Sequence, residues 1–179
     1  MHDGGALPQD TVVTTVMANL GFHRAMAGRG IHVVTTRVGD RYVAEEMRRT
    51  GAGLGGEQSG HVIFADRATT GDGILTAVRF LSLARRRGVP VRELAGVMRR
   101  FPQVIVNVPV ADRDRVRDSR GVTEAVADAE RALGDGGRVV VRASGTESLV
   151  RVMVEAEEEP AARAHAEAIA AVVREELGG

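Results

Sequence analysis

The sequence of 179 residues contains no cysteine and no tryptophan, and all 24 of its basic residues are arginines. Without cysteine there is no disulfide framework and no thiolate metal site, which fits a reducing compartment, so we expect a cytoplasmic protein. The 24 acidic residues balance the basic ones, and no net field exists to hold nucleic acid. No apolar run approaches the ~20 residues that cross a bilayer, so we expect no membrane partner.

The first half of the chain alternates strand and helix signals. Residues 11–17 are rich in β-branched residues and predict a strand, after which Asn19 can cap a helix. Residues 31–36 predict a second, buried strand, and Asp40 can cap a helix that ends at Gly51. This order of strands and helices predicts a layered α/β domain.

Two short strands are expected within residues 53–66, around a polar loop. From Gly73 an apolar stripe at helical spacing predicts a helix that ends at three consecutive arginines, whose charge suits a helix C-terminus. A shorter helix is expected at 91–100. The stripe consists of Ile74, Ala77, Val78, Leu81 and Ala84.

After Phe101 the pattern changes to strands with one apolar face. The apolar residues alternate in these strands, and Pro160 suits the first turn of a closing helix. We therefore predict a three-layer α/β domain at 1–102, followed at 103–179 by a small α+β domain with an antiparallel sheet and two helices. The segments expected to form this second domain are strands at 103–110, 138–143 and 149–156, a helix at 121–133 and the closing helix.

The loop "RASGTES" at 142–148 joins two apolar strands and carries the chemistry of an anion site. The loop contains hydroxyl groups, flanking arginines and a glycine that lets backbone N–H groups converge. All of these can donate hydrogen bonds to the oxygens of a phosphate. The same residues are also typical of a solvated hairpin turn, and spacing alone leaves both interpretations open. The candidate phosphate-binding residues are Arg142, Ser144, Gly145, Thr146 and Arg151.

The loop "GGEQSGH" at 55–61 offers a different set of groups. Glu57 can accept two hydroxyl protons, Ser59 can donate or accept, and His61 can do either near neutrality. These donors and acceptors suit a vicinal diol on a sugar ring, although a flexible polar hairpin would use similar residues. One glutamate and one histidine are too few for a metal site.

Two further segments carry polar groups at helix starts. Arg37 and Arg41 flank the turn before the second helix and are candidates for a phosphate or sugar contact, while Asp40 is equally expected as a cap. In "TTGDG", Asp72 alone does not make a magnesium site, because a helix N-terminus attracts aspartate anyway.

Taken in order, "TRVGDRYV", "GGEQSGHVIF", "TTGDGILTA", "FPQVIVNV" and "RASGTESLVRVMVE" closely resemble the C-terminal part of the bacterial phosphoglucosamine mutases, which are α-D-phosphohexomutases. Gln58 is the specific signal, because phosphomannomutase/phosphoglucomutase relatives usually have methionine there. The resemblance covers roughly residues 11–175. It implies that the first domain is the family's third domain, incomplete at its N-terminus, and that the second is its C-terminal domain.

The resemblance also implies roles for individual residues. Glu57 and Ser59 would bind ring hydroxyls with Gln58 nearby, and His61 would lie near the reacting oxygens as an acid or base. The five candidate phosphate-binding residues between 142 and 151 would hold the phosphate that is not transferred, and the turn before the second helix would contribute Arg37, Asp40 and Arg41. Both loops would then open onto one substrate cleft.

The family's phosphorylated serine and its Mg²⁺-binding loop are not found in this sequence. The resemblance therefore implies a fragment that recognises a hexosamine phosphate but is inactive alone, with Mg²⁺ used only by the complete isomerase. Its partner would be the missing N-terminal half or a second copy. The alternatives are a stand-alone phosphosugar-binding module, a different phosphohexomutase, or a decayed product without function.

Overall fold

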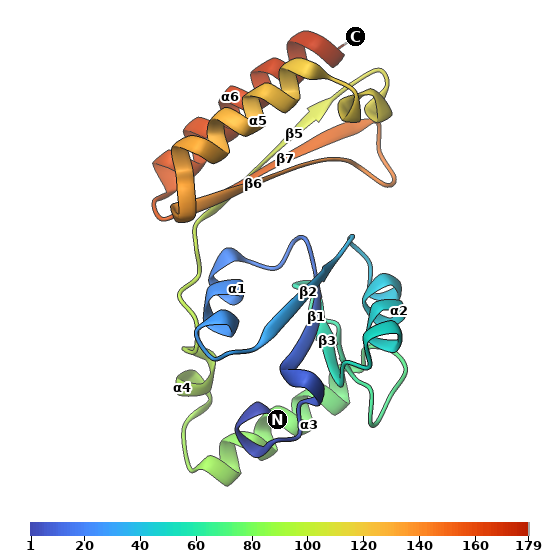
Figure 1. Cartoon of the computed structure of the whole chain (residues 1–179), viewed down its shortest axis with the longest axis vertical. Helices are drawn as coiled ribbons and strands as arrows, with labels where there is room; N and C mark the ends of the chain where they lie inside the picture. The colour runs from blue at the N-terminus through green and yellow to red at the C-terminus, as the bar shows by residue number, and fades with distance from the viewer. Residues whose placement is uncertain (179) are drawn as a thin grey trace. The chain divides into compact units, whose positions relative to one another are not determined.

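Two separate sheets organise the chain, one in each half (Figure 1). The computed structural model describes residues 1–178, which form two units: unit 1 comprises Met1–Arg100, and unit 2 begins at Phe101. No helix in this described part combines the length and hydropathy that crossing a bilayer would need.

The sheet of unit 1 has the strand order β2-β1-β3-β4. β1 (Thr11–Thr15) pairs in parallel with both β2 (His32–Thr36) and β3 (Leu54–Gly56), and β4 (Val62–Phe64) pairs with β3 in the antiparallel direction. All five residues of β1 are buried, as suits a β-branched central strand. The parallel order confirms the expected α/β class, because parallel strands need helical connections.

Helices cover both faces of this sheet. α1 (Leu20–Ala27) begins after Asn19, whose side chain accepts a hydrogen bond from the Gly21 N–H, as the sequence predicts. On one face, α2 (Asp40–Thr50) packs Val43 and Met47 into a core, and α1 covers part of the other face. Two short 3₁₀ helices, η1 (His2–Gly4) and η2 (Pro8–Asp10), precede β1.

β3 lies so close to α2 that only glycine fits at its centre. A Cβ atom at Gly55 would collide with the Met47 sulfur and with a methyl group of Val43. The glycine therefore sets the distance between the helix and the sheet, immediately before the polar loop begins.

α3 (Gly73–Arg87) is capped by Asp72, which accepts a hydrogen bond from the Leu75 N–H, and it ends at Gly88 with φ 65°. The predicted helix is confirmed, but its apolar stripe is largely uncovered: Ile74 is 81% and Val78 57% exposed, and only Ala84 is buried. The pattern therefore predicts the helix but not its burial. α4 (Val91–Ala95) is shorter than the helix expected at 91–100.

Unit 2 is an antiparallel sheet of order β5-β7-β6 with two helices packed on it (Figure 1). Apolar side chains of the central strand are completely buried beneath these helices, for example Val150, Val152 and Val154. This arrangement confirms the predicted α+β class. The elements are β5 (Gln103–Pro109), η3 (Arg113–Arg117), α5 (Arg120–Leu133), η4 (Gly134–Gly136), β6 (Gly137–Ala143), β7 (Leu149–Ala156) and α6 (Glu159–Leu177).

Two local expectations are corrected by the structure. Asp40 is the first residue of α2 and not its cap, because Gly39 occupies the cap position with φ 130°, outside the range of most residues. The strand expected to be buried at 31–36 is an edge strand and is partly exposed. The central strand β7 is buried on both faces, and its fully buried Glu155 pairs with Arg138 at 2.7 Å.

Candidate functional site

The first polar loop is a tight hairpin between β3 and β4, residues 57–61, which we call the 57–61 turn. The Glu57 N–H donates to the His61 carbonyl at 2.9 Å, and the Gly60 N–H donates to the Glu57 carbonyl at 3.0 Å. Gly60 has φ 99°, a backbone conformation that favours glycine. The backbone is thus satisfied within the turn, and the side chains are left for other partners.

Three of those side chains converge. The Ser59 hydroxyl donates to Glu57 Oε2 at 3.0 Å and lies 2.9 Å from His61 Nδ1. Because the hydroxyl has one proton and gives it to Glu57, Nδ1 must donate to Ser59, which leaves Nε2 with the lone pair of the neutral ring. The His61 side chain is 53% exposed. It is therefore accessible as a proton acceptor or, when charged, as a donor.

Glu57 also ties the turn to the start of α2. Its Oε1 accepts a hydrogen bond from the Gly39 N–H at 2.8 Å, and its side chain is only 11% exposed. The structure thereby brings the predicted residues at 37–41 next to the predicted residues at 57–61. Sequence reasoning missed Gly39, although the glycine in "VGD" was a visible signal of an unusual backbone conformation.

The arginines before and within α2 are held in place by neighbours. The Arg37 guanidinium lies 3.6 Å from the centre of the Tyr42 ring, and Arg41 donates to Glu45 at 2.9 Å. This hydrogen bond raises the pKa of Arg41 above its ordinary value. Arg37 is thus oriented by an aromatic face, a contact that cation–π attraction favours, whereas Arg41 already has a carboxylate partner.

Gln58 and Gly71 complete the environment of this turn. Gln58 is exposed at its tip. Gly71, from "TTGDG", packs against the ring and Cβ of His61 closely enough that an added Cβ would lie 3.1 Å from the His61 Cβ. The segment before α3 therefore supports His61, a role that the sequence did not indicate.

The second polar loop joins β6 to β7, and we call residues 142–151 the 142–151 loop. Arg142 and Arg151 lie directly opposite each other in the antiparallel pair, so their guanidinium groups come from neighbouring strands. Ser144 is buried, and its N–H donates to the Leu149 carbonyl at 2.9 Å. Gly145 and Thr146 are exposed at the tip, and nothing lies within 4 Å of a Cβ built on Gly145.

This loop is electrostatically positive. Burial, and secondly the charge of Arg151, lower the pKa of Arg142 below its ordinary value, which means that its charged form lacks compensation. The Arg151 Nε is buried without a hydrogen-bond partner within residues 1–178. An anion between these two arginines would supply the missing charge and acceptors.

Two residues of this loop's surroundings escaped sequence reasoning. Glu147 pairs with Arg151 at 2.7 Å, and Arg113 donates to the Glu147 carbonyl at 2.8 Å. Glu147 stands inside the quoted motif, so its charge was available as a signal. Arg113 lies 34 residues away in η3, and only the fold places it beside the loop.

The two loops belong to different units, the 57–61 turn to unit 1 and the 142–151 loop to unit 2. No group of three or more His, Cys, Asp or Glu side chains in the described part of the chain is arranged to hold a metal ion. The residues described here therefore do not fit a magnesium site.

Family models match both units. Residues 1–101 match the model of phosphoglucomutase/phosphomannomutase alpha/beta/alpha domain III, and residues 105–172 match the model of the C-terminal domain of the same proteins.

Among similar proteins, a phosphoglucosamine mutase of Frankia alni is 62% identical over 177 residues, and one of Geobacillus kaustophilus is 51% identical over 178 residues. Both matches cover 99% of this chain. The chain spans only 39% and 40% of the length of these two relatives.

Solved structures share the fold at low sequence identity. An N-acetylphosphoglucosamine mutase of Aspergillus fumigatus has a TM-score of 0.81 at 22% identity, covering 92% of this chain and 38% of that one. The same enzyme in complex with GlcNAc-6P and magnesium has a TM-score of 0.79 at 22% identity, with the same coverage.

Proposed function

The chain belongs to the phosphoglucomutase/phosphomannomutase family, and from this premise we propose that it is the substrate-recognition part of a phosphoglucosamine mutase. The complete isomerase would interconvert glucosamine 6-phosphate and glucosamine 1-phosphate through a phosphoserine and a bisphosphate intermediate. The relatives named above support this choice over phosphomannomutase or phosphoglucomutase.

The proposal rests on one observation: the two loops offer different groups, one suited to a phosphate and the other to a sugar ring. In the 142–151 loop, Arg142 and Arg151 would bind the phosphate that is not transferred, with Ser144, Gly145 and Thr146 lining its edge. Arg142 lacks a compensating anion, and the Arg151 Nε lacks an acceptor within residues 1–178.

The 57–61 turn supplies what a sugar ring requires. Glu57 Oε2 and the Ser59 hydroxyl are hydrogen-bonded to each other. When a sugar binds, this hydrogen bond would be replaced by hydrogen bonds to ring hydroxyls, while Oε1 keeps its hydrogen bond from the Gly39 N–H. Gln58 would lie at the rim. His61 Nε2 would accept or return the proton of the hydroxyl that exchanges its phosphoryl group.

The turn before α2 would extend the same surface. Arg37, held by the Tyr42 ring, would offer a guanidinium to substrate, and the hydrogen bond between Gly39 and Glu57 keeps this segment beside the sugar-binding side chains. Asp40 and Arg41 would contribute mainly by fixing the start of α2, because both already have local partners.

This chain would position substrate without completing the reaction. Phosphoryl transfer depends on positioning and on neutralising charge, and the Mg²⁺ and phosphoserine that supply the rest would come with other polypeptide. The missing N-terminal half, or alternatively a second copy, is the expected partner. The cytoplasm is the proposed location, because sugar phosphates are made and consumed there.

A complementation assay tests the proposal. The part of the Frankia alni relative outside the matched region is co-expressed with this chain, and conversion of glucosamine 6-phosphate is measured. We expect activity only from the mixture. Arg142→Gln should raise KM about tenfold or more, since a hydrogen bond to a charged group contributes about 1.5–3 kcal/mol. Arg131→Gln, on the exposed face of α5, is the matched control and should leave KM unchanged.

The outcomes separate the candidate functions. An assembled but inactive mixture would overturn the mutase proposal. If the chain alone then binds glucosamine 6-phosphate in calorimetry, the stand-alone phosphosugar-binding module replaces it. If it does not bind at millimolar concentration, both are wrong.

A further inference from the structure

The Tyr42 ring contacts the turn before α2 at two points, on either side of Val38. The Cζ atom of Arg37 lies 3.6 Å from the ring centre. A Cβ built on Gly39 would lie 3.2 Å from Cδ2 of the ring and 3.4 Å from Cε2, so the glycine packs directly against one edge of the ring. Tyr42 therefore joins the two residues through which this turn reaches the candidate sugar site.

Gly39 needs neighbours to hold its conformation. Glycine has access to more backbone conformations than any other residue, and at φ 130° Gly39 occupies a region that other residues rarely adopt. Its carbonyl accepts a hydrogen bond from the Tyr42 N–H at 3.0 Å, and the Tyr42 ring fills the space beside its Cα. With Gly39 fixed in this way, its N–H donates to Glu57 Oε1 at 2.8 Å.

This N–H decides which oxygen of Glu57 is free for a ligand. The Glu57 side chain is only 11% exposed, and its Oε1 is occupied by the Gly39 N–H, so Oε2 is the oxygen that meets the Ser59 hydroxyl. If Gly39 turned away, Oε1 would lose its donor in a largely buried position, and the carboxylate would rotate to find another. The orientation of Glu57 therefore depends on Tyr42 through one glycine.

The same ring orients Arg37. A guanidinium that stacks on an aromatic ring uses its flat face in the contact, so its N–H groups can still donate to a ligand at its edge. Arg37 is exposed, and a long exposed side chain loses rotamer freedom when a ligand fixes it. The contact with Tyr42 restricts Arg37 before a ligand arrives, which lowers that cost.

We propose that Tyr42 is a positioning residue for sugar binding, which acts through Gly39 on the Glu57 carboxylate and directly on the Arg37 guanidinium. This inference rests on the proposed function, because it takes a hexosamine phosphate as the ligand. The candidate phosphate-binding residues belong to unit 2, whereas Tyr42 belongs to unit 1. Tyr42 therefore affects binding of the sugar part of the ligand and leaves binding of the phosphate part unchanged.

Variants without the ring test this role by calorimetry of the full chain with two ligands. Tyr42→Leu should weaken binding of glucosamine 6-phosphate about fivefold or more, because a hydrogen bond to a charged group and a cation–π contact are both weakened. Its affinity for inorganic phosphate should stay within about twofold of wild type, as for independent sites. Tyr42→Phe keeps the ring and should bind both ligands like wild type. If Tyr42→Leu does not fold, Tyr42→Met, which is also apolar and has no ring, replaces it.

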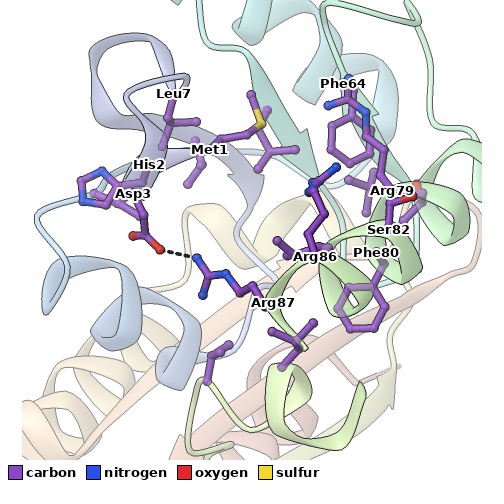
Figure 2. Close-up of a pocket in the computed structure, with 18 of the residues that line it drawn as sticks. Met1, His2, Asp3, Leu7, Phe64, Arg79, Phe80, Ser82, Arg86 and Arg87 are labelled. Carbon is purple, nitrogen blue, oxygen red and sulfur yellow. Dashed lines mark hydrogen bonds and ion pairs between the residues drawn. The ribbon is translucent and has the colours of Figure 1, made fainter. Parts of the chain in front are cut away.

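Phe80→Leu is the matched control, because it also removes an aromatic ring from unit 1. Phe80 lies on α3 beside an open groove, as Figure 2 shows, and it is 37% exposed, so the fold should be kept. None of the residues 37–42 or 57–61 lines this groove. The control variant should therefore bind both ligands like wild type.

Hydrogen exchange of the Gly39 amide reports the role of the ring without any ligand. This N–H is protected by its hydrogen bond to Glu57, so its exchange should accelerate about fivefold or more in Tyr42→Leu. It should keep its wild-type rate in Tyr42→Phe and in Phe80→Leu. Amides of α6, in unit 2, are the internal reference and should exchange at the same rate in all variants.

The outcomes separate this proposal from the proposed function. Unchanged Gly39 exchange in Tyr42→Leu overturns the positioning role, even if the wild-type chain binds glucosamine 6-phosphate. An equal loss of affinity for both ligands overturns it too, and so does an equal loss in Tyr42→Phe, which would assign the effect to the hydroxyl. If the wild-type chain does not bind glucosamine 6-phosphate, the proposed function is wrong, and the role of Tyr42 in sugar binding is wrong with it.

Discussion

Glu57 joins two parts of the candidate site, and Glu57→Gln tests this junction. The wild-type carboxylate accepts from the Gly39 N–H at 2.8 Å and from the Ser59 hydroxyl at 3.0 Å. Glutamine has one acceptor oxygen and one NH₂ group in place of the two carboxylate oxygens. One of the two hydrogen bonds therefore becomes a neutral bond, and at the other position an NH₂ donor replaces the acceptor. Hydrogen bonds to charged groups contribute about 1.5–3 kcal/mol and neutral ones about 0.5–1.5 kcal/mol. Losing the charge weakens the part-buried bond from Gly39 by about 1–1.5 kcal/mol and the exposed bond from Ser59 by less, so we expect a loss of about 1–2 kcal/mol in the free energy of unfolding.

The assay uses urea unfolding followed by tyrosine fluorescence. Tyr42 is the single tyrosine and there is no tryptophan, so the signal reports the first turn of α2, which Glu57 holds. Ser59→Ala is the control, because it removes only the bond to Oε2. That bond is exposed and water can replace the hydroxyl, so the variant should lose about 0.5–1.5 kcal/mol or less. If Glu57→Gln unfolds within 0.5 kcal/mol of wild type, the junction between the turn and α2 does not stabilise unit 1.

Three further changes have defined outcomes. Glu147→Gln frees Arg151 from an exposed pair that contributes ~0–1 kcal/mol, so affinity for inorganic phosphate in calorimetry should rise up to about fivefold, and a fall would contradict the assigned role. Gly55→Ala should cost about 1–3 kcal/mol in urea unfolding by forcing β3 away from α2, and wild-type stability would disprove the close packing. The hydrogen bond from Arg79 lowers the pKa of Asp66, so their pair stabilises the fold above the usual aspartate pKa of about 3.9 and is lost as pH falls through the lowered value. The difference in unfolding temperature between wild type and Asp66→Asn should accordingly shrink below about pH 4, and a difference independent of pH would refute the pairing.

Local chemistry made much of this fold predictable. The Asn19 cap and the glycine after α2 are decided by residues within a few positions of one another. The exposure of Val78 was not predictable, because a helical stripe shows which face is apolar and says nothing of whether another segment covers it.

The candidate site divides in the same way. The residue types in the two loops were visible in the sequence, and so was the chemistry that they favour. The contacts from Gly39 to Glu57 and from Arg113 to the 142–151 loop were not, because each joins residues far apart in the chain. Such contacts depend on tertiary packing, which no local pattern encodes.

The central claim is that the 57–61 turn and the 142–151 loop bind one hexosamine phosphate. Backbone amide signals of the isotope-labelled chain, followed by NMR during titration, test it most directly. Glucosamine 6-phosphate should shift the signals of both segments with one dissociation constant, whereas inorganic phosphate should shift only those of the 142–151 loop. If glucosamine 6-phosphate saturates the 142–151 loop and leaves the 57–61 turn unchanged, the claim is wrong.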